Sequence, residues 1–187
     1  MKTRDLAYVA LFAAILAVLG TLPAIPVGPV PITAQTLGVM LAGAVLGGRR
    51  GFLAVLLFLV LVAAGLPLLA GGRGGLGVLA GPTAGYLLSW PVAAYVVGRL
   101  TERTWDRYNV LVGTLVNVVG GIVVIYAVGV PVLKVVTGLA WGEALWTGAA
   151  LFVPGDLFKA FVAAAIADVV RRSYPVIERP RRAAGAR

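Results

Sequence analysis

The sequence predicts an all-α membrane protein, a bundle of six transmembrane helices with both termini in the cytoplasm. Charged residues make up only 12% of its 187 residues, half of the roughly 25% found in soluble domains. A helix needs about 20 apolar residues to cross a bilayer, and uncharged runs cover residues 6–48, 51–72, 74–98 and 108–133. Basic residues gather between these runs, as they do in cytoplasmic loops.

The six spans follow from the uncharged runs in order. The first run holds two spans, near residues 6–22 and 33–48, because it is broken by four prolines, which lack the amide hydrogen that a helix needs: Pro23, Pro26, Pro29 and Pro31. Further spans are expected near residues 51–69, 82–99, 108–130 and 151–170. Since more membrane segment follows the first span directly, a cleavable signal peptide is not expected there. Residues 1–172 are thus expected to form one membrane domain, followed by a mobile basic cytoplasmic tail, residues 173–187.

The basic residues orient the bundle in the inner (plasma) membrane. With the N-terminus inside, all 16 Lys and Arg lie in cytoplasmic segments except Lys159, within a span, and Arg73 and Lys134, outside. An odd number of spans would spoil this partition. The net charge of +9 would point to nucleic acid in a soluble protein. Here it marks the cytoplasmic face, where the tail lies near anionic lipid, and no nucleic-acid partner is expected.

The composition excludes several kinds of chemistry. The chain has no Cys and no His, which excludes disulfides, thiol nucleophiles, zinc sites and the Ser-His or Cys-His triads. Neither a metal nor a catalytic residue is therefore expected. Gly72, Gly74 and Gly77 match G-x-G-x-x-G, but no βαβ unit surrounds them and no acidic residue lies about 20 positions further on. A dinucleotide site is therefore rejected.

Two charged residues stand inside the last expected span. Asp156 and Lys159 are spaced i, i+3, so they share one helix face about 5–6 Å apart. Charges inside a membrane are costly and usually functional. The pair is either an internal ion pair that holds the bundle together, or a ligand site with one acceptor and one cation. A helix start suits Asp156, because the free amides there are partly positive.

A glycine-rich stretch precedes the fourth span on the outer side. Residues 71–85 contain seven glycines and include Arg73 and Gly75. They form either a flexible linker or a loop that packs tightly and presents bare amides to a ligand. A linker explains the glycines but not Thr83 and Tyr86 at the entrance of the span.

Isolated polar residues mark two other spans. Thr33 and Gln35, before and at the start of the second span, either cap that helix and bond its backbone, or offer the Gln35 amide to a ligand. Asn117 in the fifth span either joins neighbouring helices or contacts the ligand. Because the topology brings the polar stretches toward the outer face, they predict a pocket open to the outside and suited to one small amphiphile.

The first span carries alanines at a spacing that lets helices approach closely. Ala10 and Ala14, like Ala13 and Ala17, form small-xxx-small pairs, which serve either internal packing or docking against another membrane protein. The sequence has no nucleotide motif and no row of acidic residues that could relay protons. A self-contained pump is therefore not expected. A stand-alone secondary transporter, recognisable by uptake without ATPase partners, remains an alternative. A lipid-modifying membrane enzyme, which would need a nucleophile and a base within reach, is another.

Three motifs carry a resemblance to a known family: residues 29–39 (PVPITAQTLGV), residues 81–86 (GPTAGY) and residues 154–159 (PGDLFK). Over roughly residues 5–172 the chain resembles the biotin-specific substrate-binding component of energy-coupling factor (ECF) transporters, the BioY family. The resemblance implies a six-helix bundle that binds biotin from outside and needs no cofactor. It also implies docking onto a transmembrane coupling subunit with two cytoplasmic ATPases, which alone use ATP and drive release by toppling the bundle. The first span is the docking face in this class, which favours Ala10 and Ala14.

The resemblance assigns biotin, or else another small vitamin-like amphiphile, to the expected pocket. Asp156 would accept from a ureido N–H of biotin, and Lys159 would donate to the ureido carbonyl. Arg73 and the loop amides, including that of Gly75, would hold the carboxylate, unless Lys159 takes it instead. The other expected substrate-binding residues, which include the aromatic wall of the pocket, are Thr33, Gln35, Thr83, Tyr86, Trp90 and Asn117.

Overall fold

The computed structural model describes residues 2–177, and over this range the protein is all-helical. The only β-type contacts in that range are two isolated bridges, Ile25 with Ile32 and Leu69 with Arg73. The predicted all-α class is confirmed. The α-helices are α1 (Thr3–Gly20), α2 (Gln35–Leu46), α3 (Gly48–Ala63), α4 (Ala84–Arg103), α5 (Val110–Asn117), α6 (Val124–Thr137), α7 (Trp141–Leu145) and α8 (Val153–Ser173). Short 3-10 turns lie at Leu76–Leu79 and Trp105–Arg107, and π turns at Val118–Val123 and Trp146–Ala150.

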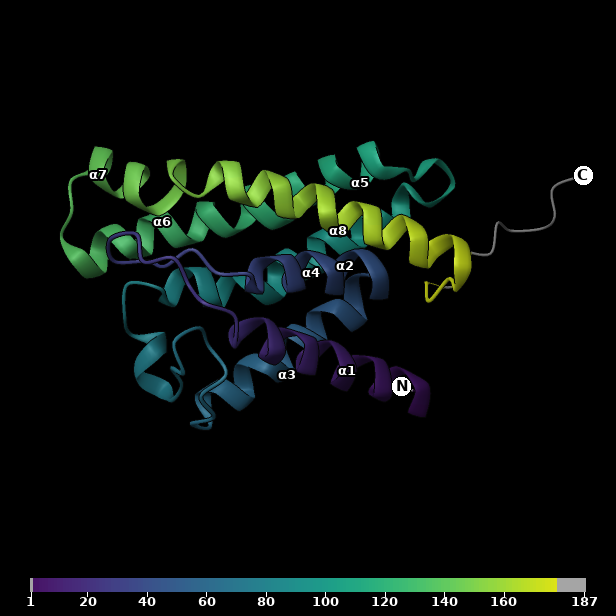
Figure 1. The fold of residues 1–187 in the computed structure, drawn as a ribbon, viewed down its shortest axis with the longest axis horizontal. Coiled ribbons are helices and arrows are strands. Elements are labelled where there is room, and N and C mark those ends of the chain that lie inside the picture. Colours follow the sequence, from purple (N-terminus) through teal and green to yellow (C-terminus); the bar gives the residue numbers. More distant parts are fainter. Residues whose placement is uncertain (1, 178–187) are drawn as a thin grey trace, which may run out of the picture.

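The helices lie side by side along the long axis of the molecule (Figure 1). α2 and α4 occupy the middle, where α4 packs against α2, α3 and α6, and α2 also packs against α8. α1 and α3 lie along one side of this pair, and α5, α6 and α8 along the other (Figure 1). α2 is buried along its whole length except at Thr36 and Leu37. A helix that is apolar on all sides is stable when neighbouring helices cover it, because its side chains then contact other apolar side chains instead of solvent.

Three of the described helical segments are long and apolar enough to cross a membrane: Thr3–Gly20, Val110–Thr137 and Trp141–Ser173. The last two run beyond the spans expected at 108–130 and 151–170. The fifth continues through Pro131, since a membrane helix tolerates the loss of the one backbone hydrogen bond that a proline removes. In the sixth, α8 begins close to the expected start, with Pro154 in its first turn, where proline is favoured. The segment reaches ten residues further back because α7 and a π turn precede α8.

α4 passes against the turn between α2 and α3 with no room for a side chain. That turn is the single residue Gly47, whose φ of 83° is readily adopted only by glycine. A Cβ on Gly98 of α4 would lie 2.2 Å from the backbone nitrogen of Gly48. Helix backbones that meet this closely need small residues at the contact.

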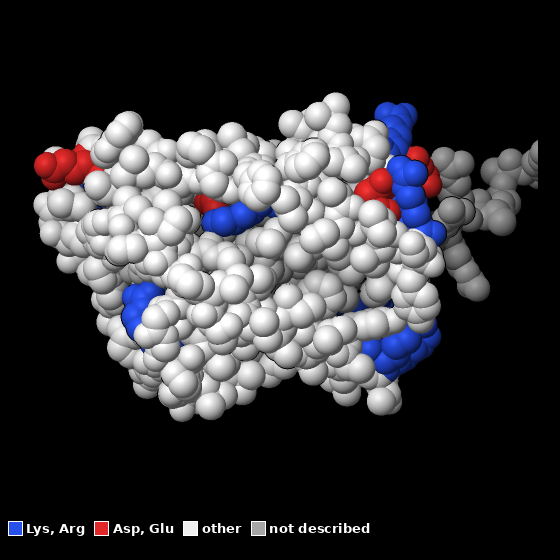
Figure 2. Space-filling model, viewed as in Figure 1, with Lys and Arg blue, Asp and Glu red and all other residues white. Residues whose placement is uncertain are grey.

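One end of the bundle is tied together by basic side chains. Arg50 at the start of α3 pairs with Asp5 of α1 at 2.9 Å and donates to the carbonyl of Val176, after α8, at 3.0 Å. Arg171 near the end of α8 pairs with Asp168 and donates to the carbonyl of Tyr108, before α5. Figure 2 shows charged side chains gathered at this end, where α1 begins and α8 ends, and a largely uncharged surface beyond it.

The segment expected to be a mobile tail begins as part of the bundle. Val176 and Ile177 are buried, and the Arg50 bond holds this stretch against the start of α3. The rest of the expected tail, residues 178–187, lies outside the described residues.

Candidate ligand-binding site

A cavity lies at the end of the bundle opposite the charged end, among segments that are far apart in sequence. It measures about 560 Å³ including its opening to solvent. Its walls come from the segment before α2, the start of α2, the loop after α3, and helices α4, α6 and α8. The lining residues are Val30, Pro31, Thr33, Gln35, Thr36, Leu69, Arg73, Thr83, Tyr86, Leu87, Trp90, Ile125, Tyr126, Phe152, Asp156 and Lys159.

The charged pair in α8 forms the polar centre of this cavity. Asp156 is 4% exposed and lies 2.8 Å from the Lys159 ammonium. Its carboxylate also accepts from the Thr36 hydroxyl at 3.2 Å and from the Tyr126 hydroxyl. Asp156 belongs to the first turn of α8, where the free amides favour a negative charge.

Lys159 joins α8 to the start of α2. Its ammonium donates to the Thr33 carbonyl at 2.7 Å and to the Thr36 hydroxyl at 3.1 Å, as well as to Asp156. An ammonium has three hydrogens, so all of them are used. A carboxylate has about four acceptor positions, and three protein donors reach that of Asp156. A buried ion pair stays favourable only when further hydrogen bonds satisfy it, and here they do.

Gln35 fixes the floor of the cavity. Its amide nitrogen donates to the carbonyls of Leu16 at 3.2 Å and Leu68 at 3.1 Å, and its oxygen accepts from the amide of Ala70 at 3.3 Å. The side chain therefore connects the end of α1, the start of α2 and the loop after α3. Thr33 does not cap α2, since the cap position is Ala34 and no side chain bonds to it there.

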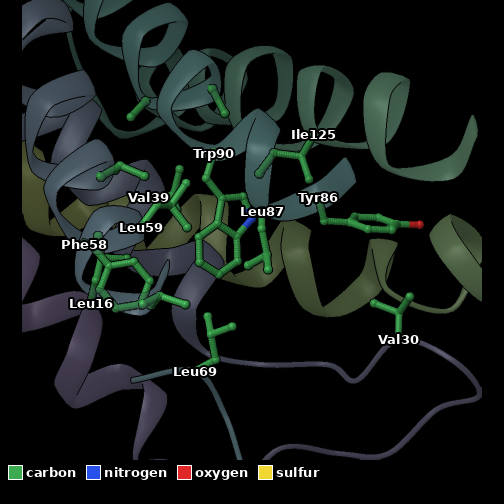
Figure 3. Packing of buried hydrophobic residues seen from close by; sticks show 14 of the residues in the cluster. Leu16, Val30, Val39, Phe58, Leu59, Leu69, Tyr86, Leu87, Trp90 and Ile125 are labelled. Carbon is green, nitrogen blue, oxygen red and sulfur yellow. The ribbon is translucent and has the colours of Figure 1, made fainter. Parts of the chain in front are cut away.

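Aromatic side chains of α4 form the apolar wall. Tyr86 is buried and donates from its hydroxyl to the carbonyl of Gly148 at 2.8 Å. The Trp90 indole stacks on Phe58 with ring centres 6.2 Å apart, in the core cluster near Leu87 (Figure 3). Trp90 is 5% exposed, and its ring nitrogen has no hydrogen-bond partner among residues 2–177. Within this range it is therefore a buried donor without a partner in the wall of the cavity.

Arg73 is the exposed cation at the rim of the cavity. It donates one hydrogen bond, from Nε to the Ala70 carbonyl at 3.2 Å, and no ion pair holds it within the described part of the chain. The amide of Gly75 is not bare, because it donates to the Val62 carbonyl at 2.7 Å. Gly75 does not line the cavity.

Eight of the ten residues expected to bind substrate line the cavity: Thr33, Gln35, Arg73, Thr83, Tyr86, Trp90, Asp156 and Lys159. The structure keeps Gly75 and Asn117 apart from it. Asn117 is fully buried and donates to the Ala160 carbonyl at 3.0 Å. It therefore joins α5 to α8, which is the first of the two roles expected for it.

Sequence reasoning missed several residues of the site. Thr36 and Tyr126 contact the Asp156 carboxylate directly, and the apolar lining comes from residues without any motif. Thr36 lies one residue beyond the selected Gln35 in the same polar stretch. Tyr126 had a weaker signal, a hydroxyl in the middle of the uncharged run 108–133.

The expected docking residues lie on the outside of the bundle. Ala10 and Ala14 are exposed on α1, next to Leu11 and Val18, which are 54% and 65% exposed. Ala13 on the opposite face is buried. Internal packing thus accounts for Ala13 and not for Ala10 and Ala14.

Known proteins share both the sequence and the fold. The sequence model of the BioY family matches residues 1–176. The biotin transporter BioY of Rhizobium etli is 52% identical over 184 residues, covering 95% of this chain and 98% of that protein. The biotin transporter BioY of Rhodobacter capsulatus is 48% identical over 181 residues, covering 92% and 95%.

A solved structure extends the likeness to three dimensions. The crystal structure of the S-component for biotin from an ECF-type ABC transporter superposes with a TM-score of 0.88 at 30% identity, covering 94% of this chain and 97% of that one. The family match spans nearly all of the described residues and includes all three motifs singled out from the sequence. The chain belongs to the BioY family.

Proposed function

We propose that this protein captures biotin from the outside and takes it up as the substrate-binding component of an ECF transporter. The observation that carries the proposal is the buried Asp156–Lys159 pair in the wall of a cavity within an apolar bundle. Relatives named as biotin transporters and a solved S-component for biotin support the choice of ligand. Because the family consists of transporters, the lipid-modifying enzyme is no longer a candidate.

In this proposal the polar centre of the cavity binds the ureido ring. The fourth acceptor position of Asp156 takes one ureido N–H. The Tyr126 hydroxyl donates to Asp156, so its oxygen remains able to accept the other ureido N–H. Lys159 reaches the ureido carbonyl by exchanging its longest hydrogen bond, to Thr36 at 3.1 Å. The apolar thiophane then lies against Tyr86 and Trp90.

Arg73 is the proposed partner of the biotin carboxylate. Its guanidinium is exposed at the cavity rim and keeps free donors beside the bond to Ala70, and arginine binds carboxylates in a bidentate manner. Lys159 suits the carboxylate less well. Asp156 already supplies one negative charge 2.8 Å from its ammonium, so a second carboxylate there would meet a like charge.

We further propose six membrane spans with both termini in the cytoplasm. The six segments are α1, α2, α3, α4, α5–α6 and α7–α8. The bonds of Arg50 to Asp5 and Val176 support this topology, because they join the start of α1, the start of α3 and the chain end after α8 at one basic end. Basic ends face the cytoplasm, so the cavity at the other end faces outward in the inner membrane.

The second span is a half-helix that serves the site. α2 has 12 residues and is about 18 Å long at 1.5 Å per residue, well short of the roughly 30 Å hydrocarbon core. The irregular chain before it completes the crossing and lines the cavity with Val30, Pro31 and Thr33. Irregular backbone at membrane depth is tolerated where it lines such a cavity.

The proposed partners are a transmembrane coupling subunit and two cytoplasmic ATPases, which alone use ATP, while this chain needs no cofactor. The exposed Ala10–Ala14 face of α1 supports docking, because small residues on an outer helix face allow a second helix to approach closely. Leu11 and Val18 flank this face and add apolar contact area.

A thermal-shift screen of the purified protein in detergent tests the ligand. Biotin at 100 times its Kd should stabilise the fold by about 2.7 kcal/mol and raise Tm by several degrees, while riboflavin, thiamine and pantothenate leave it unchanged. If another vitamin instead of biotin raised Tm by several degrees, the protein would be a substrate-binding component for that vitamin. No rise with biotin would refute the proposal.

A further inference from the structure

A second concave site lies on the outside of the bundle between α3 and α4. It is lined by Arg49, Phe52 and Leu53 of α3 and by Val92 and Tyr95 of α4, and it measures about 760 Å³ including open solvent. It shares no residue with the cavity around Asp156. Val92 and Tyr95 are 48% and 43% exposed, so the groove opens toward the surroundings of the bundle.

The groove has an apolar body and one charged end. The rings of Phe52 and Tyr95 meet edge to face with centres 6.5 Å apart, which joins the two helices. Arg99 lies over the Tyr95 ring at 5.9 Å and pairs with Glu102 at 2.9 Å. Arg49 stands in the first turn of α3, so the groove runs from the basic end of the bundle into the membrane-embedded part.

Arg49 has no acidic partner among the described residues, in contrast to four other arginines at this end of the bundle. Arg50, Arg99, Arg171 and Arg172 each pair with a carboxylate at 2.8–3.0 Å, whereas no ion pair involves Arg49 within residues 2–177. Its side chain is exposed. The exposed Arg49 guanidinium is therefore free to bind an anionic headgroup at the membrane border.

We propose that this groove binds one anionic phospholipid. The phosphate lies against Arg49, which can bind it in a bidentate manner. One acyl chain lies along Phe52, Leu53 and Val92. Basic pockets between transmembrane helices bind anionic headgroups on the cytoplasmic side, and here Arg49 lies at one end of an apolar groove that can hold an acyl chain.

Native mass spectrometry of the purified full-length protein in detergent tests the site. Phosphatidylglycerol and phosphatidylcholine with the same acyl chains are added at equal concentration, and bound lipid is counted. The parent protein should retain phosphatidylglycerol preferentially. Arg49→Gln should lower that retention roughly 10-fold or more, the effect of losing a charge-assisted contact. Val92→Trp, which fills the groove and leaves the charge in place, should also lower it.

Arg103→Gln is the matched control. Arg103 is exposed at the end of α4 and does not line the groove, so this variant loses the same charge at the same end and should retain lipid as the parent does. Only variants that keep the Tm of the parent protein and elute like it in size-exclusion chromatography are compared. Equal retention of both lipids by the parent would overturn the proposal. So would equal losses in Arg49→Gln and Arg103→Gln, or full retention in Val92→Trp.

Discussion

Asp156→Asn tests the centre of the proposed biotin site with little change of shape. The substitution replaces an ionised acceptor by a neutral amide, and charge-assisted hydrogen bonds are roughly twice as strong as neutral ones. The fold should survive, because Lys159 keeps its bonds to the Thr33 carbonyl and the Thr36 hydroxyl. The Tyr126 hydroxyl can rotate to accept from the new amide group.

The expected loss is in ligand affinity. Asp156 is 4% exposed, so water cannot replace the lost charge, and the ureido contact should weaken by about 1.5–3 kcal/mol. This corresponds to a roughly 10- to 150-fold rise in Kd. Calorimetric titration of the purified variant with biotin measures it. Biotin amidated at its carboxylate should show the same loss, whereas an analogue altered in the ureido group should bind poorly and equally to parent and variant.

Asp168→Asn is the matched control for this experiment. Asp168 is also a buried carboxylate of α8 and pairs with Arg171 and Arg172, but it lies at the far end of the helix and does not line the cavity. Its loss should lower thermal stability and leave the affinity for biotin unchanged. If Asp156→Asn remains folded and binds biotin with parental strength, the Asp156–Lys159 pair is structural and the assignment of the site is refuted.

Three further outcomes are expected. Arg73→Gln should weaken biotin binding about 10-fold or more and leave binding of the amidated analogue unchanged; equal titration losses for both would remove Arg73 from the carboxylate. Replacing both Ala10 and Ala14 with Leu should abolish co-purification with the coupling subunit and preserve biotin binding. The control Ala127→Leu, at an exposed site on α6, should leave both intact. Unchanged co-purification of the double variant would put docking elsewhere. A reporter active only in the cytoplasm should work at the C-terminus and be silent near Gly74, and the reverse would turn the cavity inward.

The polar groups of the site were largely predictable, because the membrane makes each of them conspicuous. Asp156 and Lys159 interrupt an apolar span at a spacing that any helix converts into one face. Their contacts were not predictable in the same way. Tyr126 follows no motif, and only the packing of α6 against the rest of the bundle brings its hydroxyl to Asp156.

The roles of individual polar residues also depended on packing. The Gln35 amide is used by three backbone groups from two other segments, a pattern that no local sequence signal contains. Gly75 was expected to offer a bare amide, but the backbone of the loop folds back so that Val62 accepts it. Helix ends were least predictable near prolines, since Pro131 lies within α6 and Pro154 opens α8 instead of ending a span.

The contact between Gly98 and Gly48 has a consequence for which substitutions the protein can accept. Even alanine at position 98 would place its methyl carbon 2.2 Å from a main-chain nitrogen, and main chain cannot move aside as a flexible side chain does. By contrast, the leucines on the outside of the bundle, such as Leu111 at 71% exposure, face lipid and can be exchanged for other apolar residues. A complete mutational scan selected for growth on scarce biotin should therefore find the strictest requirement where the chain has no side chain at all.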